Sequence, residues 1–350
     1  MAIITHAFVS AISDGGDATV VRPSSWNADH AIGTTFIAPQ GRLTLQTGVP
    51  VQTADQTAKT TVYYDSFIGS LCPVWNGTTW DYLGITGDEI SMGLAAANVL
   101  NGNVYDIWGV NSGGSLACGV GPAWSTSTSR GTGAGTNELQ FKHGIRTNRN
   151  ALTNVYGGAA GTTNYGSILA NRATLLGTLY ATANGQTGVA LTPAAANGGS
   201  NTIVGLFNAY NGVPVIARSA DSGGGANWSY ASSTWRAVNG NNNNRITFVD
   251  GLQIYAHSTS HQSSIGGGGS IYGTIGVNLD STTNAPNIST IVGGVANQFA
   301  NGIAQENFYP QLGLHYFQAM EAASGGTCNF AGSGATPTRQ PQCLAASVLI

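Results

Sequence analysis

Charged side chains are the scarcest class in this sequence. Asp, Glu, Lys and Arg together make up 8% of the 350 residues, whereas a soluble globular domain averages roughly 25%. The only lysines are Lys59 and Lys142, and the formal net charge is −3. Nonspecific nucleic-acid binding needs a basic patch that displaces counterions from the phosphates. The composition therefore argues against nucleic acid as a partner.

Long apolar runs are also missing. No stretch approaches the roughly 18 apolar residues of a membrane-spanning helix, and the first residues lack the basic start of a secretory signal. We therefore expect no membrane insertion, and we expect the chain to be made in the cytoplasm of the producing cell.

Cysteine is rare, and its spacing is uninformative. Cys72, Cys118, Cys328 and Cys343 show no C-x-x-C pair, which disfavours a structural zinc site. Buried free thiols are the favoured interpretation. The alternative is a disulfide between Cys328 and Cys343, which would close a small loop.

Catalytic signatures are equally scarce. The sequence has no G-x-S-x-G and no H-E-x-x-H, and Gly131 to Gly135 resembles a nucleotide loop without the Lys and Ser of a P-loop. His257 and His261 form the only i, i+4 histidine pair, which we expect in a loop where the rings need not converge. Glycoside hydrolysis needs two carboxylates about 5 to 10 Å apart, and the nominal candidates are Asp81, Asp88, Glu89, Asp106 and Glu138. We predict no catalytic residues, no metal and no cofactor.

What the sequence does contain is β-forming material. It is 42% hydrophobic with 50 glycines, which disfavours disorder. Short runs of Val, Ile, Thr and aromatic residues fit a pleated, half-buried surface and predict strands. These runs are 43–45, 60–64, 104–110, 174–180, 203–207, 213–216 and 245–249, with a weaker strand prediction for 312–321.

Turn signals separate these runs. Asn-Gly, the strongest short hairpin signal, begins at residues 76, 101, 184, 197, 211, 239 and 301. Val99 to Tyr105 looks like an antiparallel hairpin, followed by alternation that sets Tyr105 and Ile107 opposite Val104 and Trp108. We expect the tracts Asn239 to Asn244 and Gly266 to Ser270 to be exposed loops.

Tryptophan and arginine are the two residue types for which the sequence suggests specific side-chain contacts. Trp75 and Trp80 flank one Asn-Gly turn, and we favour a hairpin in which the two rings pack across the strands. The alternative is a platform for glycan contact. Arginines outnumber lysines in the body, and we expect them to pair with the few carboxylates, since a guanidinium suits bidentate geometry.

Near the amino terminus, Asp14, Asp17, Arg22, Trp26 and His30 crowd into one short segment. Carboxylate and imidazole groups could form a metal or catalytic loop. The alternative is a turn-rich docking arm, in which the glycines and Pro23 shape the chain. Val20, Val21, Pro23 and Trp26 would then provide the apolar grip on a neighbouring protein.

This segment, Asp14-Gly-Gly-Asp-Ala-Thr-Val-Val-Arg-Pro-Ser-Ser-Trp-Asn-Ala-Asp-His30, resembles a stretch near the start of tailed-bacteriophage minor structural proteins. Ser25 stands where an acidic residue is common in that group. The body is similar to the same group in segments such as Asn103-Val-Tyr-Asp-Ile107 and Arg245-Ile-Thr-Phe-Val-Asp-Gly251. The resemblance covers most of residues 1 to about 325, and the tail after Cys328 resembles nothing familiar.

The resemblance implies a homotrimeric fibre or spike of the virion, on the tail, neck or head, that contacts the host surface through a glycan or protein. We therefore expect an all-β chain, with an extended arm followed by an antiparallel β-sandwich or jelly-roll-like body. The predicted divisions are the attachment arm and connector at 1–41, and two body halves at 42–190 and 191–350 that could form one continuous domain. The alternatives are a tailspike-like polysaccharide depolymerase and a non-enzymatic carbohydrate-binding module.

Overall fold

Strands make up nearly all the regular structure of this protein. The computed structural model describes residues 3–4, 30–31, 37–192, 197–222, 227–266, 271–293, 299–332 and 342–350. Over these residues it contains no α-helix, and its helical content is limited to two 3₁₀ turns, η1 (Thr86–Asp88) and η3 (Val238–Gly240). Among the described strands, all pairs are antiparallel except one, in which β17 runs parallel to β22. The predicted all-β class is confirmed.

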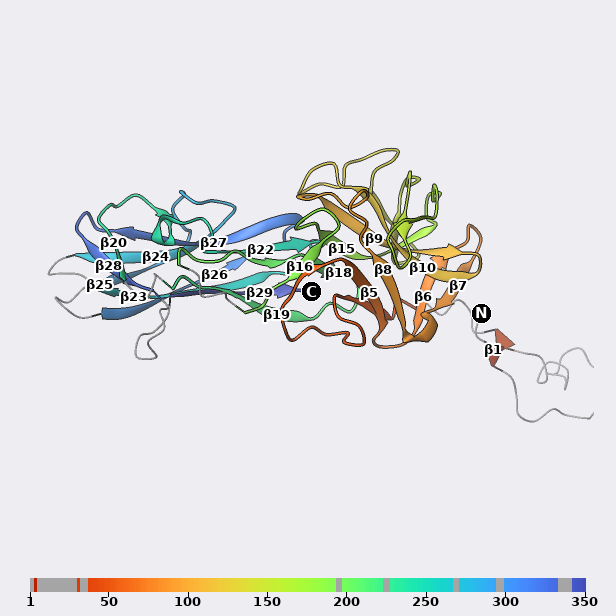
Figure 1. The fold of residues 1–350 in the computed structure, drawn as a ribbon, viewed down its shortest axis with the longest axis horizontal. Helices are drawn as coiled ribbons and strands as arrows, with labels where there is room; N and C mark the ends of the chain where they lie inside the picture. Colours follow the sequence, from red (N-terminus) through yellow and green to blue (C-terminus); the bar gives the residue numbers. More distant parts are fainter. Residues whose placement is uncertain are drawn as a thin grey trace, which may run out of the picture.

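The body is elongated and has two lobes (Figure 1). The N-terminal lobe is built on an eight-stranded sheet in which β9 is flanked by β10 and β15. In sheet order its strands are β11 (Leu139–Lys142), β12 (Ile145–Asn148), β15 (Ala173–Tyr180), β9 (Val104–Ser112), β10 (Ser115–Ala123), β13 (Tyr156–Gly157) and β14 (Thr163–Asn164), with β18 (Leu206–Asn208) paired to β15.

Strand β9 separates two hydrophobic clusters. Tyr105 and Ile107 belong to the largest cluster, whereas Val104 and Trp108 belong to a second one on the opposite face. The period-2 alternation read from the sequence is therefore confirmed, because successive side chains of a strand point to opposite faces. The strand is buried on both sides, so neither set of side chains reaches solvent.

Two small sheets cover the face that carries Tyr105 and Ile107. The first contains three strands in the order β3 (Gly41–Thr44), β5 (Thr61–Ser66) and β8 (Glu89–Gly93). The second is the hairpin of β6 (Leu71–Trp75) and β7 (Trp80–Gly84). Gln40 joins β3 to this hairpin, because its backbone N–H donates to the Leu71 carbonyl and its side chain accepts from the Leu71 N–H. The connector after the arm thus enters the body beside β6.

The C-terminal lobe is a β-sandwich. Its first sheet runs β25 (Ser289–Gly293), β24 (Tyr272–Leu279), β27 (Gly313–Ala323), β22 (Arg245–Asp250), β17 (Thr202–Val204), β16 (Thr187–Val189) and β4 (Gln56–Lys59), with β21 (Arg236–Ala237) paired to β27. Its second sheet runs β19 (Pro214–Ser219), β29 (Cys343–Leu349), β23 (His257–Gly266), β28 (Cys328–Ala331) and β20 (Asn227–Tyr230), with β26 (Phe299–Phe308) paired to β23. Ile275 from the first sheet packs with Ile265 and Phe330 from the second.

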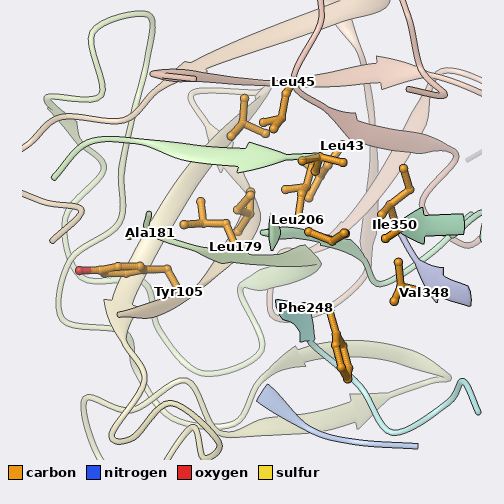
Figure 2. Close-up of a cluster of buried hydrophobic side chains, with 14 of the residues drawn as sticks. Leu43, Leu45, Tyr105, Leu179, Ala181, Leu206, Phe248, Val348 and Ile350 are labelled. Atoms are coloured by element: carbon orange, nitrogen blue, oxygen red, sulfur yellow. The ribbon is translucent and has the colours of Figure 1, made fainter. Parts of the chain in front are cut away.

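The largest cluster joins the two lobes. Figure 2 shows Leu43 and Leu206 beside Val348 and Ile350, although these residues come from the start, the middle and the end of the chain. Arg42 is 1% exposed and reinforces this junction. Its guanidinium donates to the carbonyl oxygens of Pro50, Asn211 and Ile350 at 2.6, 2.6 and 2.8 Å. The shared core therefore contains residues from both sides of residue 190. The predicted division of the body into halves at 42–190 and 191–350 stays a prediction.

The strand predictions are confirmed at 43–45, 60–64, 104–110, 174–180, 213–216, 245–249 and 312–321. The run 203–207 forms two strands instead of one, because Gly205 interrupts it between β17 and β18. Its N–H donates to the Gly188 carbonyl and its carbonyl accepts from Tyr180, so this residue bridges two sheets.

The hairpin predicted for residues 99 to 105 is wrong. Asn101 and Gly102 do form a turn, but the residues before it are not a strand. The Gly102 N–H donates to the Ala181 carbonyl, and the Leu100 N–H donates to the Tyr105 hydroxyl. The hairpin partner of β9 is β10, reached through Gly113 and Gly114. The backbone N–H groups around this turn therefore bond to the Ala181 carbonyl and a side-chain hydroxyl, and not to a neighbouring hairpin strand.

Two further turn or loop predictions need correction. Asn301 and Gly302 lie inside β26, where Gly302 pairs with Ser263. A Cβ on Gly302 would lie 2.3 Å from Val292 Cγ2, so this glycine permits close packing of β25 and β26. The Asn239 to Asn244 tract is mostly at the surface, but Asn244 is fully buried and donates to Asp221 and the Val238 carbonyl. Residues 267 to 270 of the other tract lie outside the described residues.

The candidate disulfide between Cys328 and Cys343 does not form, and all four cysteines are free thiols. Strands β28 and β29 both pair with β23, but at different positions along it. Cys343 lies opposite Gln262, whereas Asn329, the residue after Cys328, lies opposite Gly266. At roughly 3.3 Å per residue the two cysteines are more than about 13 Å apart, well beyond disulfide reach.

Candidate functional site

The predicted attachment arm is almost entirely outside the described residues. This applies to Asp14, Asp17, Val20, Val21, Arg22, Pro23 and Trp26. His30 lies in the two-residue strand β2 (His30–Ala31), which pairs with β1 (Ile3–Ile4). The proposed roles of these residues stay predictions.

The hairpin predicted around Trp75 and Trp80 is confirmed. These residues pair directly across β6 and β7, and their rings meet edge to face with centroids 5.4 Å apart. His143 packs against both rings, and Trp80 Nε1 donates to its Nδ1 at 3.2 Å. The Lys142 ammonium lies 4.5 Å from the Trp75 ring centroid. Much of the aromatic surface is therefore engaged by protein groups, and glycan contact here stays a prediction.

A groove at the junction of the two lobes contains a denser group of polar and aromatic side chains. It has a volume of about 410 Å³ and lies between the loop Ser127–Thr128 and the outward face of the first sandwich sheet. Its lining residues are Ser127, Thr128, Tyr180, Asn201, Ile203, Arg245, Thr247, Asp280, Leu314, His315 and Tyr316. The loop is fixed over the sheet because the Leu314 N–H donates to the Ser127 carbonyl at 2.8 Å.

Alternation along two neighbouring strands positions the charged and aromatic groups of this groove. In β22, Arg245 and Thr247 face the groove while Ile246 and Phe248 enter the core. In β27, Leu314 and Tyr316 face it while Phe317 enters the core. Thr247 lies opposite Tyr316 in the antiparallel register. Strand pairing alone therefore brings together side chains from distant parts of the sequence.

Asp280 and His315 form an ion pair at the rim of the groove. His315 Nδ1 lies 2.6 Å from Asp280 Oδ2, and His315 Nε2 lies 3.1 Å from the Leu312 carbonyl. Burial lowers the pKa of His315, but the bonds to Asp280 and Leu312 outweigh it, so the net pKa is raised. Because both ring nitrogens point at acceptors, the geometry suits the doubly protonated ring. A histidine held in this way is a poor general base.

Arg245 is the least satisfied cation in the groove. Its guanidinium stacks on the Tyr316 ring with 5.0 Å between the guanidinium carbon and the ring centroid. Its Nε is buried without a hydrogen-bond partner. Among the described residues the ion-paired arginines are Arg130, Arg149 and Arg236. These three confirm the expected arginine–carboxylate pairing, whereas Arg146, Arg172, Arg218 and Arg245 make no ion pair with a described carboxylate.

The i, i+4 histidine pair lies on strand β23, not in a loop as expected. His257 Nε2 lies 2.7 Å from Asp250, and its Nδ1 faces the Ser347 carbonyl. His261 Nδ1 faces the Gly276 carbonyl, and burial lowers the pKa of this ring to about 4. Both rings are fully buried. Within the described ranges, no group of three or more His, Cys, Asp or Glu side chains is arranged to hold a metal ion.

The carboxylates named as candidates for glycoside hydrolysis lie in different environments. Asp106 is buried and receives a bidentate bond from Arg130, whereas Asp81 accepts from Asn76 and Asn111. Glu138 is paired with Arg149 at the surface. Asp88 and Glu89 line a second groove of about 350 Å³ together with Asp65.

Sequence analysis missed Asp65. It lies directly opposite Glu89 in the β5–β8 register and is 3% exposed. Burial, reinforced by the neighbouring Glu89 carboxylate, raises the pKa of Asp65 to about 7. Its oxygens accept no hydrogen bond from another described donor, and they meet the Glu89 carboxylate, to which Asp65 can donate when it is protonated. The alternation of Thr61 to Ser66 could have placed Asp65 on an inward or outward face, but only the pairing with β8 brings the two carboxylates together.

Comparison with known proteins gives little guidance. No family model matches the chain, and no curated protein matches it. Among solved structures, the insecticidal delta-endotoxin Cry8Ea1 from Bacillus thuringiensis matches with 8% sequence identity and a TM-score of 0.22. The match covers 89% of this chain and 52% of the toxin chain, so the protein spans about half the length of that relative. The described residues include no helix long and apolar enough to cross a membrane.

Proposed function

We propose that this protein is a structural component of a bacteriophage virion: a homotrimeric fibre or spike, docked to the particle through residues 1–41. The arm sequence supports docking through its likeness to phage minor structural proteins. The body supports the fibre through its elongated shape, with β6 and β7 at one end and β20, β25 and β28 at the other (Figure 1). The connector enters at the β6 end, so the opposite end projects away from the attachment point.

One observation carries the self-association, namely the outward face of the second sandwich sheet. By register, this face consists of alternate residues of β19, β29, β23 and β26. They are Pro214, Ile216 and Arg218; Cys343, Ala345, Ser347 and Leu349; Ser258, Ser260, Gln262 and Ser264; and Phe299, Asn301, Ile303, Gln305 and Asn307. Arg218 is the single charged side chain among them.

This face suits another copy of the chain. Ile216, Phe299 and Ile303 are 45%, 46% and 51% exposed, and the other side chains of the face are uncharged except for Arg218. Burying such a face requires little ion desolvation, whereas burying an unpaired charge is costly. Strand β26 is also an edge strand, and native proteins usually cover or block long edges. Packing against other copies of the chain would cover both the exposed apolar residues and the open edge of β26.

Truncation and mass measurement test the two parts of the proposal. We expect the full chain to have the mass of a trimer by light scattering. Deletion of residues 1–36 should preserve this mass while abolishing incorporation into particles, because Gln40, β3 and everything after them remain intact. A monomeric full chain would contradict the fibre, and normal incorporation of the truncated chain would contradict the docking role. Shortening of host polysaccharide by the purified protein would instead favour the depolymerase alternative.

A further inference from the structure

The groove at the lobe junction contains a cation without a counter-ion. Arg245 makes no ion pair with any described carboxylate, and its Nε is buried and unpartnered. A buried donor without a partner destabilises the fold, because its lost hydration is not replaced by a hydrogen bond. The guanidinium carbon lies 5.0 Å from the Tyr316 ring centroid, so the ring supports one side of the cation. A guanidinium can bind a carboxylate or a phosphate through two parallel N–H donors.

The one carboxylate that lines the groove is already engaged. Asp280 accepts from His315 through one carboxylate oxygen and from the Tyr316 N–H through the other, at 2.6 and 2.9 Å. The negative charge of Asp280 is therefore largely neutralised by His315, because the raised pKa of His315 favours the protonated, cationic ring. The charges that line the groove are Arg245, Asp280 and His315. Their sum is positive whenever His315 is protonated, and Arg245 faces no competing free carboxylate.

The remaining lining suits a polyhydroxylated ring. Tyr180 and Tyr316 supply aromatic surface, and the apolar faces of a sugar ring pack on such rings. Thr247 donates to Asn201 at 2.8 Å, which orients the Asn201 amide nitrogen as a donor and leaves Thr247 oxygen lone pairs as acceptors. Ser127 and Thr128 add hydroxyl groups on the opposite wall. An apolar cleft with a few convergent polar groups is the usual form of a small-ligand site.

We propose that this groove binds a carboxylated saccharide, with the sugar carboxylate on Arg245 and the ring against Tyr316. The proposal gives a ligand class to the host contact in the proposed function. It stands on the groove alone and does not require the chain to be a trimer or a virion component.

The test uses two probes that differ only in charge. Tetragalacturonic acid and its fully methyl-esterified form would be titrated into the full-length protein by calorimetry at pH 6 and low salt. We expect the acid to bind at least tenfold more tightly than the ester, since a charge-assisted bidentate pair is among the stronger hydrogen-bonded contacts. Equal binding of the two forms, or no binding of the acid at millimolar concentration, would overturn the proposal.

Variants locate the site. Arg245→Gln should reduce acid binding at least tenfold and leave ester binding unchanged, while Tyr316→Ala should weaken both. Arg218→Gln is the matched control, because it removes an exposed arginine from the opposite sheet and should leave binding unchanged. Thermal unfolding of each variant separates loss of the ligand contact from loss of the fold. Acid binding that survives Arg245→Gln in a folded protein would place the ligand elsewhere and contradict the proposal.

Discussion

The two outward faces of the C-terminal sandwich differ in how they use charge. The face formed by β19, β29, β23 and β26 carries Arg218 as its single charged residue. The opposite face gathers Arg245, Asp280 and His315 into a groove with Tyr316. Only 8% of the residues are charged, so this uneven distribution gives the two faces different binding properties. An uncharged face can be buried against another protein at low desolvation cost, whereas a charged groove can bind a small polar ligand.

The largest effect should come from placing charge on the uncharged face. The double variant Ile216→Glu, Ile303→Glu should weaken subunit association about 100-fold or more, because like charges brought together in an interface cost several kcal/mol. Sedimentation at several protein concentrations measures the change. Leu169→Glu introduces the same group at a 63% exposed leucine of the N-terminal lobe and should leave association intact. An unchanged mass for the double variant would place the subunit contact on another surface.

A smaller effect should follow at Asp65, a carboxyl without the ion-pair partner that Asp280 has. Its folded pKa of about 7 lies above the ordinary value of 3.8. The ionised form is therefore disfavoured in the folded protein, and stability falls as pH rises from about 4 through 7. Asp65→Asn should remove this loss and stabilise the protein by on the order of 2 kcal/mol at pH 8, with little effect at pH 4.

Chemical denaturation at both pH values measures this difference. Asp88→Asn is the matched control, because Asp88 is an exposed neighbour in the same groove with φ of 68°, a conformation that asparagine tolerates. A gain of stability for Asp65→Asn that is equal at pH 4 and pH 8 would show that packing, not ionisation, is responsible.

The smallest effect, with the opposite pH dependence, is expected at Asp280. The folded pKa of His315 is raised, so the pair contributes stability that is fully present below the unfolded pKa of about 6.5 and is lost as pH rises through the folded pKa. Asp280→Asn should destabilise the protein at pH 5.5 by less than about 1 kcal/mol, because the carboxylate is 40% exposed and screened. Melting temperatures from pH 5.5 to 8.5 would show the variant and parent converging at the alkaline end. A constant difference across the range would rule out the ion pair as its source.

Most of the runs that local patterns marked as strands do form strands, whereas β10, β24 and β26 were not predicted and β23 was expected to be a loop. Thr61 to Tyr64 and Val104 to Val110 combine β-branched and aromatic residues with period-2 alternation, and both form buried strands. The Trp75–Trp80 hairpin was predictable because its turn and both strands are contiguous in sequence. The hairpin at 99–105 failed for the complementary reason. Its turn residues are real, but their hydrogen bonds go to Ala181 and to the Tyr105 hydroxyl, which no local pattern reveals.

The groove could not be predicted from any one segment. Arg245 follows an asparagine tract, Asp280 comes directly after β24, and His315 belongs to a run whose pattern indicates only a strand. Each is unremarkable where it stands in the sequence. They share one site because β22 and β24 both pair with β27, and strand order in a sheet is decided by long-range packing.

The sequence by itself determined the β class, the alternation of side chains along β9 and the scarcity of charge, since all three follow from residue types and their spacing. The tertiary structure decided where the few charges lie. It placed the Asp65 carboxyl against that of Glu89, paired Asp280 with His315, and placed Arg245 on Tyr316 without a counter-ion. The physical reason is that alternation fixes which face a side chain occupies, whereas strand pairing fixes its neighbours, and charge acts through neighbours.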